Sequence, residues 1–250
     1  MNANSVPPKP PTNLSSSEIQ ARIDSTGEPL AYVEGFAYFY GRRFIVTPDV
    51  LIPRPETENI INLALAHCLA RNFANCDDES DSCRVQVDSM QVLDLCTGSG
   101  CVGITLKLEN PQLDVTCSDI SEQALEVARQ NAEQLQAVVK FTTSDLFSNL
   151  PGRYDLIVTN PPYVDKDWPW LDQKSLDHEP SLALYAEEHG LQLIKKILES
   201  APDHLKTNGL LLLECDPSQH QAVINYAATQ SLTHITTRGF ILAFRPNQKQ

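Results

Sequence analysis

The sequence predicts an α/β protein with a doubly wound, mostly parallel seven-stranded sheet whose last strand is antiparallel, preceded by a short helical and β-hairpin region. From Gln91 onward, short apolar runs alternate with amphipathic segments of helical length, which is the pattern of repeated strand–helix units. At the end of the chain, residues 233–237 and 240–244 are two β-rich runs separated only by Arg238-Gly239. That spacing leaves no room for a crossover helix, so we expect a hairpin that reverses the last strand.

The part of the chain before Pro53 is less regular. Residues 1–14 contain four prolines and cannot bury enough apolar surface to become ordered, which predicts a disordered tail. Ser15 to Ile23 is expected to be a short helix. Aromatic and β-branched residues on both sides of Gly41-Arg42 predict a hairpin between Phe36 and Val46. Residues 15–52 therefore form a short N-terminal region, and residues 53–250 form the main domain.

The main domain is expected to open with an extended segment, residues 50–58, that leads into a helix ending near Phe73. Pro55 suits a first helical turn, and Glu56 and Glu58 suit the positive end of the helix dipole. Residues 76–82 are acidic without an apolar period, which indicates a solvated loop. Strands are then expected near 91–95, 113–118, 137–142, 154–158 and 209–214, and helices near 101–109, 121–135, 188–206 and 217–230.

Composition excludes several classes of function. The 250-residue chain has 19 basic and 32 acidic residues and a net charge of −13, which repels phosphate backbones and disfavours direct nucleic-acid binding. No apolar run approaches the length of a membrane span and the start lacks a basic, apolar leader, so we expect a soluble, cytoplasmic protein without a membrane contact. Seven cysteines without Cys-x-x-Cys spacing and six histidines without ligand spacing predict reduced thiols and no metal.

A glycine loop follows the strand at 91–95 and opens a helix. It reads Asp94-Leu95-Cys96-Thr97-Gly98-Ser99-Gly100-Cys101-Val102-Gly103 and contains Gly-x-Gly-x-x-Gly, and Asp119 closes the next strand about 20 residues later. A dinucleotide and S-adenosylmethionine both place a ribose over such a turn, so these features alone do not choose between them. Asp94 is expected either to cap the loop or to face a ligand ammonium group.

A further acidic residue follows the third predicted strand. Asp145 is placed to accept from an adenine amino group, with Leu146 against the ring; a turn or cap role is the alternative.

The strand ending at Val158 runs directly into Asn160-Pro161-Pro162-Tyr163. Proline fixes its own φ and holds the preceding residue extended, so the backbone around Asn160 is stiff. A stiff turn with a side-chain amide at a strand end suits a site that grips one planar polar group.

Three segments, 160–163, 51–58 and 94–100, together closely resemble the peptide chain release factor glutamine methyltransferases (the HemK/PrmC family). The resemblance extends roughly from Gly27 to Leu198 and includes Glu179-Pro180-Ser181-Leu182-Ala183-Leu184. It implies a Rossmann-like class I methyltransferase fold, S-adenosylmethionine as cofactor, and methylation of the glutamine in the Gly-Gly-Gln motif of release factors, hence a role in translation termination. The enzyme is expected to act as a monomer.

The resemblance also implies a set of site residues. The Asn160 side-chain oxygen and the Pro161 carbonyl would accept the two hydrogens of the substrate amide, and Tyr163 would pack against the amide. Arg54, Glu56 and Thr57 would close over the methionine end of the cofactor or over the substrate. The predicted cofactor set is Asp94, Cys96, Thr97, Gly98, Ser99, Gly100, Asp119, Ile120, Asp145, Leu146 and Asn160. The predicted substrate set is Asn160, Pro161, Pro162, Tyr163, Arg54, Glu56 and Thr57.

The chain departs from the family at its N-terminus. Members usually carry a larger helical N-terminal domain that docks the substrate, and here only about residues 12–30 could represent it. Three alternatives share much of the pattern: a glutamine methyltransferase of a ribosomal protein, a DNA adenine amino methyltransferase, and a non-catalytic module that binds S-adenosylmethionine. The DNA enzyme would need a basic groove for a flipped base, which this acidic chain does not offer.

Overall fold

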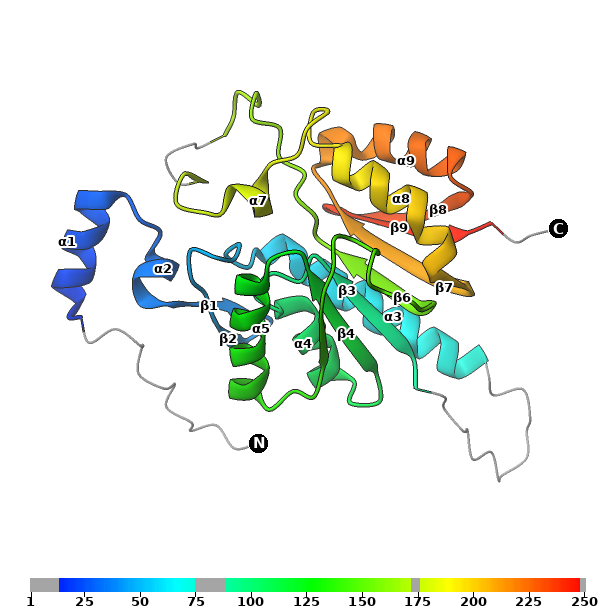
Figure 1. Ribbon diagram of the computed structural model, residues 1–250, viewed down its shortest axis with the longest axis horizontal. Helices are drawn as coiled ribbons and strands as arrows, with labels where there is room; N and C mark the ends of the chain where they lie inside the picture. Colours follow the sequence, from blue (N-terminus) through cyan, green and yellow to red (C-terminus); the bar gives the residue numbers. More distant parts are fainter. Residues whose placement is uncertain (1–13, 75–88, 172–175, 248–250) are drawn as a thin grey trace.

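The computed structural model describes residues 14–74, 89–171 and 176–247. Its main domain contains a seven-stranded sheet in the order β5-β4-β3-β6-β7-β9-β8 (Figure 1). The strands are β3 (Gln91–Leu95), β4 (Asp114–Asp119), β5 (Lys140–Thr143), β6 (Tyr154–Thr159), β7 (Leu205–Glu214), β8 (Leu232–Arg238) and β9 (Ile241–Pro246). Strands β3 to β7 pair in parallel, whereas β9 is antiparallel to both β7 and β8. The predicted fold class and the antiparallel last strand are confirmed.

Alternate residues of each strand enter two apolar layers, because successive side chains point to opposite faces of a sheet. Val92 packs with α3 (Glu58–Ala74) and α4 (Cys101–Glu109) on one face. Leu93 packs with α8 (Gln192–His204) and α9 (His220–Thr229) on the other face. Figure 1 shows α8 and α9 together on their side of the sheet. Both faces are covered, as a parallel sheet requires.

The N-terminal region contains α1 (Ser16–Thr26), α2 (Leu30–Glu34) and the predicted hairpin of β1 (Phe36–Phe39) and β2 (Arg42–Ile45). The buried side chain of Asn131, on α5 (Glu122–Leu135), ties the hairpin to the main domain. It accepts from Ile45 N at 2.6 Å and donates to Ile45 O at 3.0 Å and to Ser99 O at 2.9 Å. The same amide therefore joins the hairpin, α5 and the glycine loop.

Several predicted boundaries differ from the observed ones. The helix expected over 188–206 begins only at Gln192, because Glu188, His189 and Gly190 have left-handed backbones that a helix does not allow. Strand β5 begins at 140 rather than 137, and β7 begins at 205 rather than 209. The short helices α2 and α7 (Ser181–Leu184) were not predicted, since four or five residues are too few for an apolar period.

The predicted extended segment leads into a 3-10 turn, η1 (Pro55–Thr57), and then into α3, with Pro55 in the first turn as expected. The predicted disordered tail, apart from Leu14, and the acidic stretch 76–82 lie outside the described residues. Within the described ranges, none of the helices has the length and apolar character needed to cross a membrane.

Candidate active site

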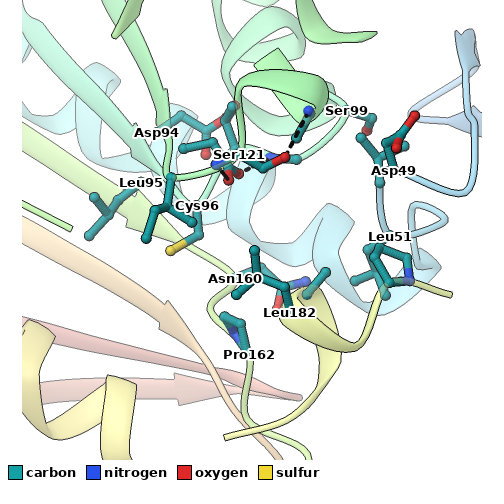
Figure 2. A pocket seen from close by; sticks show the side chains of 18 of the residues that line it. Asp49, Leu51, Asp94, Leu95, Cys96, Ser99, Ser121, Asn160, Pro162 and Leu182 are labelled. Atoms are coloured by element: carbon teal, nitrogen blue, oxygen red, sulfur yellow. Dashed lines mark hydrogen bonds between the residues drawn. The ribbon is translucent and has the colours of Figure 1, made fainter. Parts of the chain in front are cut away.

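A cavity of about 270 Å³ opens at the carboxyl ends of β3, β4 and β6. The sheet order reverses here, since β4 lies on one side of β3 and β6 on the other, and such switch points are where doubly wound sheets bind ligands. Residues 48–54 and the region around α7 complete the walls. Figure 2 shows Asp94 and Cys96 on one side of the cavity, Asn160 and Pro162 on another, and Leu51 on a third.

The glycine loop forms the wall at the end of β3. Gly98 and Gly100 have φ values of 54° and 79°, which glycine adopts without strain. Gly98 N donates to Asp119 Oδ2 at 2.9 Å, and Ser121 N donates to Asp119 Oδ1 at 3.0 Å. The carboxylate predicted to hold a ribose therefore also anchors the loop to the end of β4. Burial raises the pKa of Asp119.

Asp94 lies beneath this loop and is 2% exposed. Its Oδ2 accepts from Gly103 N at 2.8 Å and from the Thr97 hydroxyl, so the predicted capping role is observed. Asp94 also lines the cavity, so a role toward a ligand ammonium group stays compatible with its position. Burial raises the pKa of Asp94 to about 7.

Asp145 and Leu146 line the cavity where the chain leaves β5. The Asp145 side chain makes no hydrogen bond within the described part of the chain, which argues against the alternative that it caps a turn. Ile120, which follows Asp119, also lines the cavity and is 51% exposed. The remaining predicted cofactor residues, Cys96, Thr97, Gly98 and Ser99, line the same cavity, whereas Gly100 lies behind it as the first residue before α4.

The turn that follows β6, residues 160–163, is called the Asn160–Tyr163 turn below. Asn160 lines the cavity and its Nδ2 donates to the buried Thr57 Oγ1 at 3.2 Å. This hydrogen bond joins two of the predicted segments, which are 103 residues apart in sequence. Pro162 also lines the cavity, whereas Pro161 and Tyr163 do not.

Tyr163 packs against the apolar layer under α8 and α9, and its hydroxyl donates to Glu214 Oε1 at 3.2 Å. Its predicted stacking on a substrate amide stays a prediction. The Gln219 side chain holds the same turn from behind, because its Nε2 donates to Tyr163 O at 2.9 Å and to His189 O at 3.0 Å.

Arg54 and Thr57 line the cavity, whereas Glu56 is exposed outside it. Arg54 Nη2 donates to Glu179 Oε1, and Ile52 N donates to Glu179 Oε2 at 3.1 Å. The Glu179 side chain is only 1% exposed, so the pair is largely shielded from water on that side. It ties the segment before η1 to the segment that leads into α7, and both segments line the cavity.

Several lining residues were not selected from the sequence. Glu179 and Glu214 are buried carboxyl groups beside this site whose partners come from distant segments, which spacing does not reveal. The unselected lining residues are Pro48, Asp49, Val50, Leu51, Pro53, Leu95, Cys101, Val102, Ser121, Gln123, Ala124, Ser144, Pro180, Leu182, Ala183 and Leu193. Val50 and Leu51 belong to the segment 50–58 that was predicted to be extended, and their apolar side chains were the available signal.

Comparison with known proteins identifies the family. Residues 82–169 match the family model described as "Methyltransferase small domain". A protein of Neisseria gonorrhoeae named release factor glutamine methyltransferase is 41% identical over 215 residues, which cover 82% of this chain and 72% of that protein. This chain belongs to the release factor glutamine methyltransferase family. A second member, from Koribacter versatilis, is 41% identical over 214 residues, covering 82% of this chain and 70% of its own.

The methyltransferase fold is also found in solved structures of low sequence identity. A 16S rRNA methyltransferase of T. thermophilus, in complex with AdoMet and guanosine, has a TM-score of 0.55 at 17% identity, covering 85% of this chain and 50% of that chain. At that identity the likeness concerns the fold alone. The predicted family and fold are thus both confirmed.

Proposed function

We propose that this chain transfers a methyl group from S-adenosylmethionine to the side-chain amide nitrogen of the glutamine in the Gly-Gly-Gln motif of peptide chain release factors. The observation that carries the proposal is the placement of Asn160 at the cavity wall with its Nδ2 donated to Thr57. That contact leaves Asn160 Oδ1 as an acceptor, and an acceptor is what a primary amide with two N–H groups requires. The family relationship supports the same substrate.

The residues of the cavity fit the chemical groups of S-adenosylmethionine. Asp94 offers a carboxyl group to the ammonium, Asp119 to the ribose hydroxyls and Asp145 to the adenine amino group, with Leu146 beside it. The left-handed glycines let the loop backbone approach the ligand closely. When bound, the cofactor supplies an electrophilic methyl group on its sulfonium.

The protein's contribution to the chemistry is positioning. An amide nitrogen is a poor nucleophile because its lone pair is delocalised into the carbonyl. If Asn160 Oδ1 and Pro161 O accept its two hydrogens, the nitrogen is held in one orientation toward the methyl group. Positive charge develops on that nitrogen during transfer, so the same acceptors stabilise the transition state more than the ground state.

The remaining predicted residues support this arrangement. We assign Pro162 and Tyr163 to the stiffness and packing of the turn that presents Asn160. Arg54 and Thr57 belong to the wall of the site, and Glu56 is exposed outside the cavity, on a surface that an incoming protein substrate can contact. We further propose that residues 15–52 contribute to docking of the release factor on the domain formed by residues 53–250. The enzyme would act as a cytoplasmic monomer that contacts neither nucleic acid nor membrane directly.

Mass spectrometry with three alternative substrates tests the proposal. The full chain and S-adenosylmethionine would be incubated separately with a release factor, with ribosomal proteins and with duplex DNA. We expect one added methyl group on the release factor and none on the other two. Methylated adenine in the DNA or a methylated glutamine in a ribosomal protein, with an unmodified release factor, would assign the site to a different substrate. Loss of methylation on cofactor omission confirms the donor.

A further inference from the structure

A buried carboxyl group lies behind the Asn160–Tyr163 turn and has no part in the chemistry above. Glu214 is the last residue of β7 and is 0% exposed. One of its oxygens, Oε1, accepts from the Tyr163 hydroxyl at 3.2 Å. The other, Oε2, is buried without a partner of full hydrogen-bond geometry among the described residues. Glu214 does not line the cavity, so its influence on a substrate must pass through its neighbours.

Those neighbours lead to Asn160. The Thr57 hydroxyl lies close enough to Glu214 to lower the pKa of that carboxyl group by hydrogen bonding. The same hydroxyl oxygen accepts from Asn160 Nδ2 at 3.2 Å. A hydroxyl can accept one hydrogen bond while donating its own hydrogen, so Thr57 can serve both residues at once. Hydrogen bonds thus join Asn160 to Thr57 and Tyr163 to Glu214. The Thr57 hydroxyl hydrogen and Glu214 Oε2, which lacks a partner among the described residues, are the donor and the acceptor that would close the link between these two pairs.

The direction of these hydrogen bonds matters for the reaction. An ionised carboxylate only accepts, so it draws the hydrogens of both hydroxyls toward itself. The Thr57 oxygen is then left as an acceptor, which favours the NH₂ end of the Asn160 amide on that side. The Oδ1 end of the amide must consequently face away from Thr57. On that side it can accept the hydrogens of a substrate amide.

We propose that Glu214 is a positioning residue that, through Thr57 and Tyr163, sets which end of the Asn160 amide faces the substrate. The inference rests on the proposed function, because only a substrate with N–H groups needs the oxygen end of that amide. It assigns the buried glutamate of β7 a task in methyl transfer without contact to either reactant.

Protonation of Glu214 would release this constraint, since a carboxylic acid can itself donate to a hydroxyl. Burial raises the pKa of Glu214 to about 7, and the negative charge of Glu56 adds to the rise. The Thr57 and Tyr163 hydroxyls and the positive charge of Arg54 act in the opposite direction and lower that pKa. Burial raises the pKa of the Cys215 and Cys101 thiols, and the charge of Glu214, which both thiols face, adds to the rise. The ionised form prevails above the folded pKa, so kcat should rise as the pH rises through about 7.

The first test compares Glu214→Gln with a matched control. The carboxamide keeps the shape but presents a donor to one of the two hydroxyls. Glu199→Gln is the control, because Glu199 on α8 also accepts from a tyrosine hydroxyl, that of Tyr226 on α9, away from the cavity. We expect Glu214→Gln to lower kcat by about tenfold or more while KM and the dissociation constant of S-adenosylmethionine change by less than about twofold. The control should match the wild type in all three.

The pH profile separates positioning from a structural role. Wild-type kcat should show an ionisation near pH 7 that Glu214→Gln lacks. Tyr163→Phe removes a hydrogen bond that lowers the pKa of Glu214, so it should move that ionisation to higher pH. A Glu214→Gln enzyme with kcat within about twofold of the wild type, or with the same ionisation, would overturn the proposal.

An NMR readout keeps this test independent of the substrate. In ¹⁵N-labelled wild-type protein, the Asn160 side-chain NH₂ resonances should shift with a midpoint near pH 7, and this shift should be absent in Glu214→Gln. If the chemical shifts of the Asn160 side-chain NH₂ group change neither with pH nor with the substitution, the positioning role is refuted, even if release factors are methylated. A wild-type protein that shows the shift but methylates no release factor would refute the proposed function instead.

Discussion

Replacing Gly190 with alanine tests how accurately the Asn160–Tyr163 turn must be placed. Gly190 has a φ of +80°, and a Cβ built there lies 2.0 Å from Tyr163 O and 2.6 Å from Gln219 Nε2. Real Cβ contacts are essentially never shorter than 3.0 Å, so residue 190 and the Tyr163 carbonyl must separate by about 1 Å. A misplacement of about 1 Å costs roughly 10²-fold in rate, and we expect kcat to fall by about that factor.

The same substitution should also lower stability. A left-handed backbone costs a residue with a Cβ about 1–2 kcal/mol, and the clash adds about 1–3 kcal/mol. Gly41→Ala is the matched comparison, because Gly41 has a φ of +72° but no atom within 4 Å of the added Cβ. Gly41→Ala therefore measures the free-energy cost of a left-handed alanine backbone without that of a steric clash.

Single-turnover methyl transfer with saturating cofactor, together with urea unfolding, gives both quantities. We predict that Gly190→Ala lowers the rate far more than Gly41→Ala does and lowers the free energy of unfolding by about 1–3 kcal/mol more. Equal rates for the two variants would refute the claim that Gly190 places the turn.

Three further predictions concern the walls of the site. Arg54→Met removes the partner of the buried Glu179 carboxylate at the cavity wall. The dissociation constant of S-adenosylmethionine, measured by calorimetry, should rise about tenfold, and the free energy of unfolding should fall by about 1–3 kcal/mol. An unchanged affinity would show that the Arg54–Glu179 pair does not influence cofactor binding. The pKa of Asp94 is raised to about 7, so Asp94 loses its negative charge as the pH falls through that value. The affinity for the cofactor should therefore drop at least about fivefold between about pH 7.5 and about pH 5.5. Asp94→Asn should abolish this pH dependence, and a variant that still shows it would exclude Asp94 as the cause. Asn131→Ala should lower the free energy of unfolding, measured by chemical denaturation, by about 2–3 kcal/mol because three hydrogen bonds are lost. A decrease of less than about 0.5 kcal/mol would mean that packing alone holds the hairpin.

The fold was predictable because local and long-range patterns agree in the main domain. The alternation of apolar strands and amphipathic helices after Gln91 fixes the layers, and the Arg238-Gly239 turn fixes the antiparallel end. Element boundaries were less predictable. Glu188 and His189 have ordinary helix-compatible side chains, so their sequence does not reveal the left-handed backbone that delays α8. In the tertiary structure Gln219 Nε2 donates to the carbonyls of both His189 and Tyr163, and Gly190 lies against Tyr163.

The candidate site was predictable where chemistry is local in sequence. The loop from Asp94 to Gly100, Asp119 and Asp145 each follow a strand, and parallel strands bring their carboxyl ends to one edge of the sheet. Thr57 and Asn160 were both predicted to lie at the substrate site, but a direct contact between them was not predicted. Its hydrogen bond spans 103 residues and cannot be read from spacing.

The supporting carboxylates were not predictable from sequence. Glu179 was noted only as part of the segment Glu179–Leu184 that resembles the family, and neither it nor Glu214 was assigned to the site, because charged residues are rarely buried unless paired. Their burial follows from the tertiary structure, which places Arg54 and Ile52 against one and Tyr163 and Thr57 against the other. This is why the sequence pointed to the residues that line the candidate site but not to the buried carboxyl groups behind them.

The central claim is that Asn160 holds a release factor glutamine for methylation. Tandem mass spectrometry of a release factor treated with the wild-type chain or with Asn160→Ala tests it most directly. We predict one methyl group, located on the Gly-Gly-Gln glutamine, with the wild type, and at least about 10²-fold slower transfer with Asn160→Ala, by analogy with the loss of one transition-state hydrogen bond. A methyl group on another residue, or transfer by Asn160→Ala at the wild-type rate, would contradict the account.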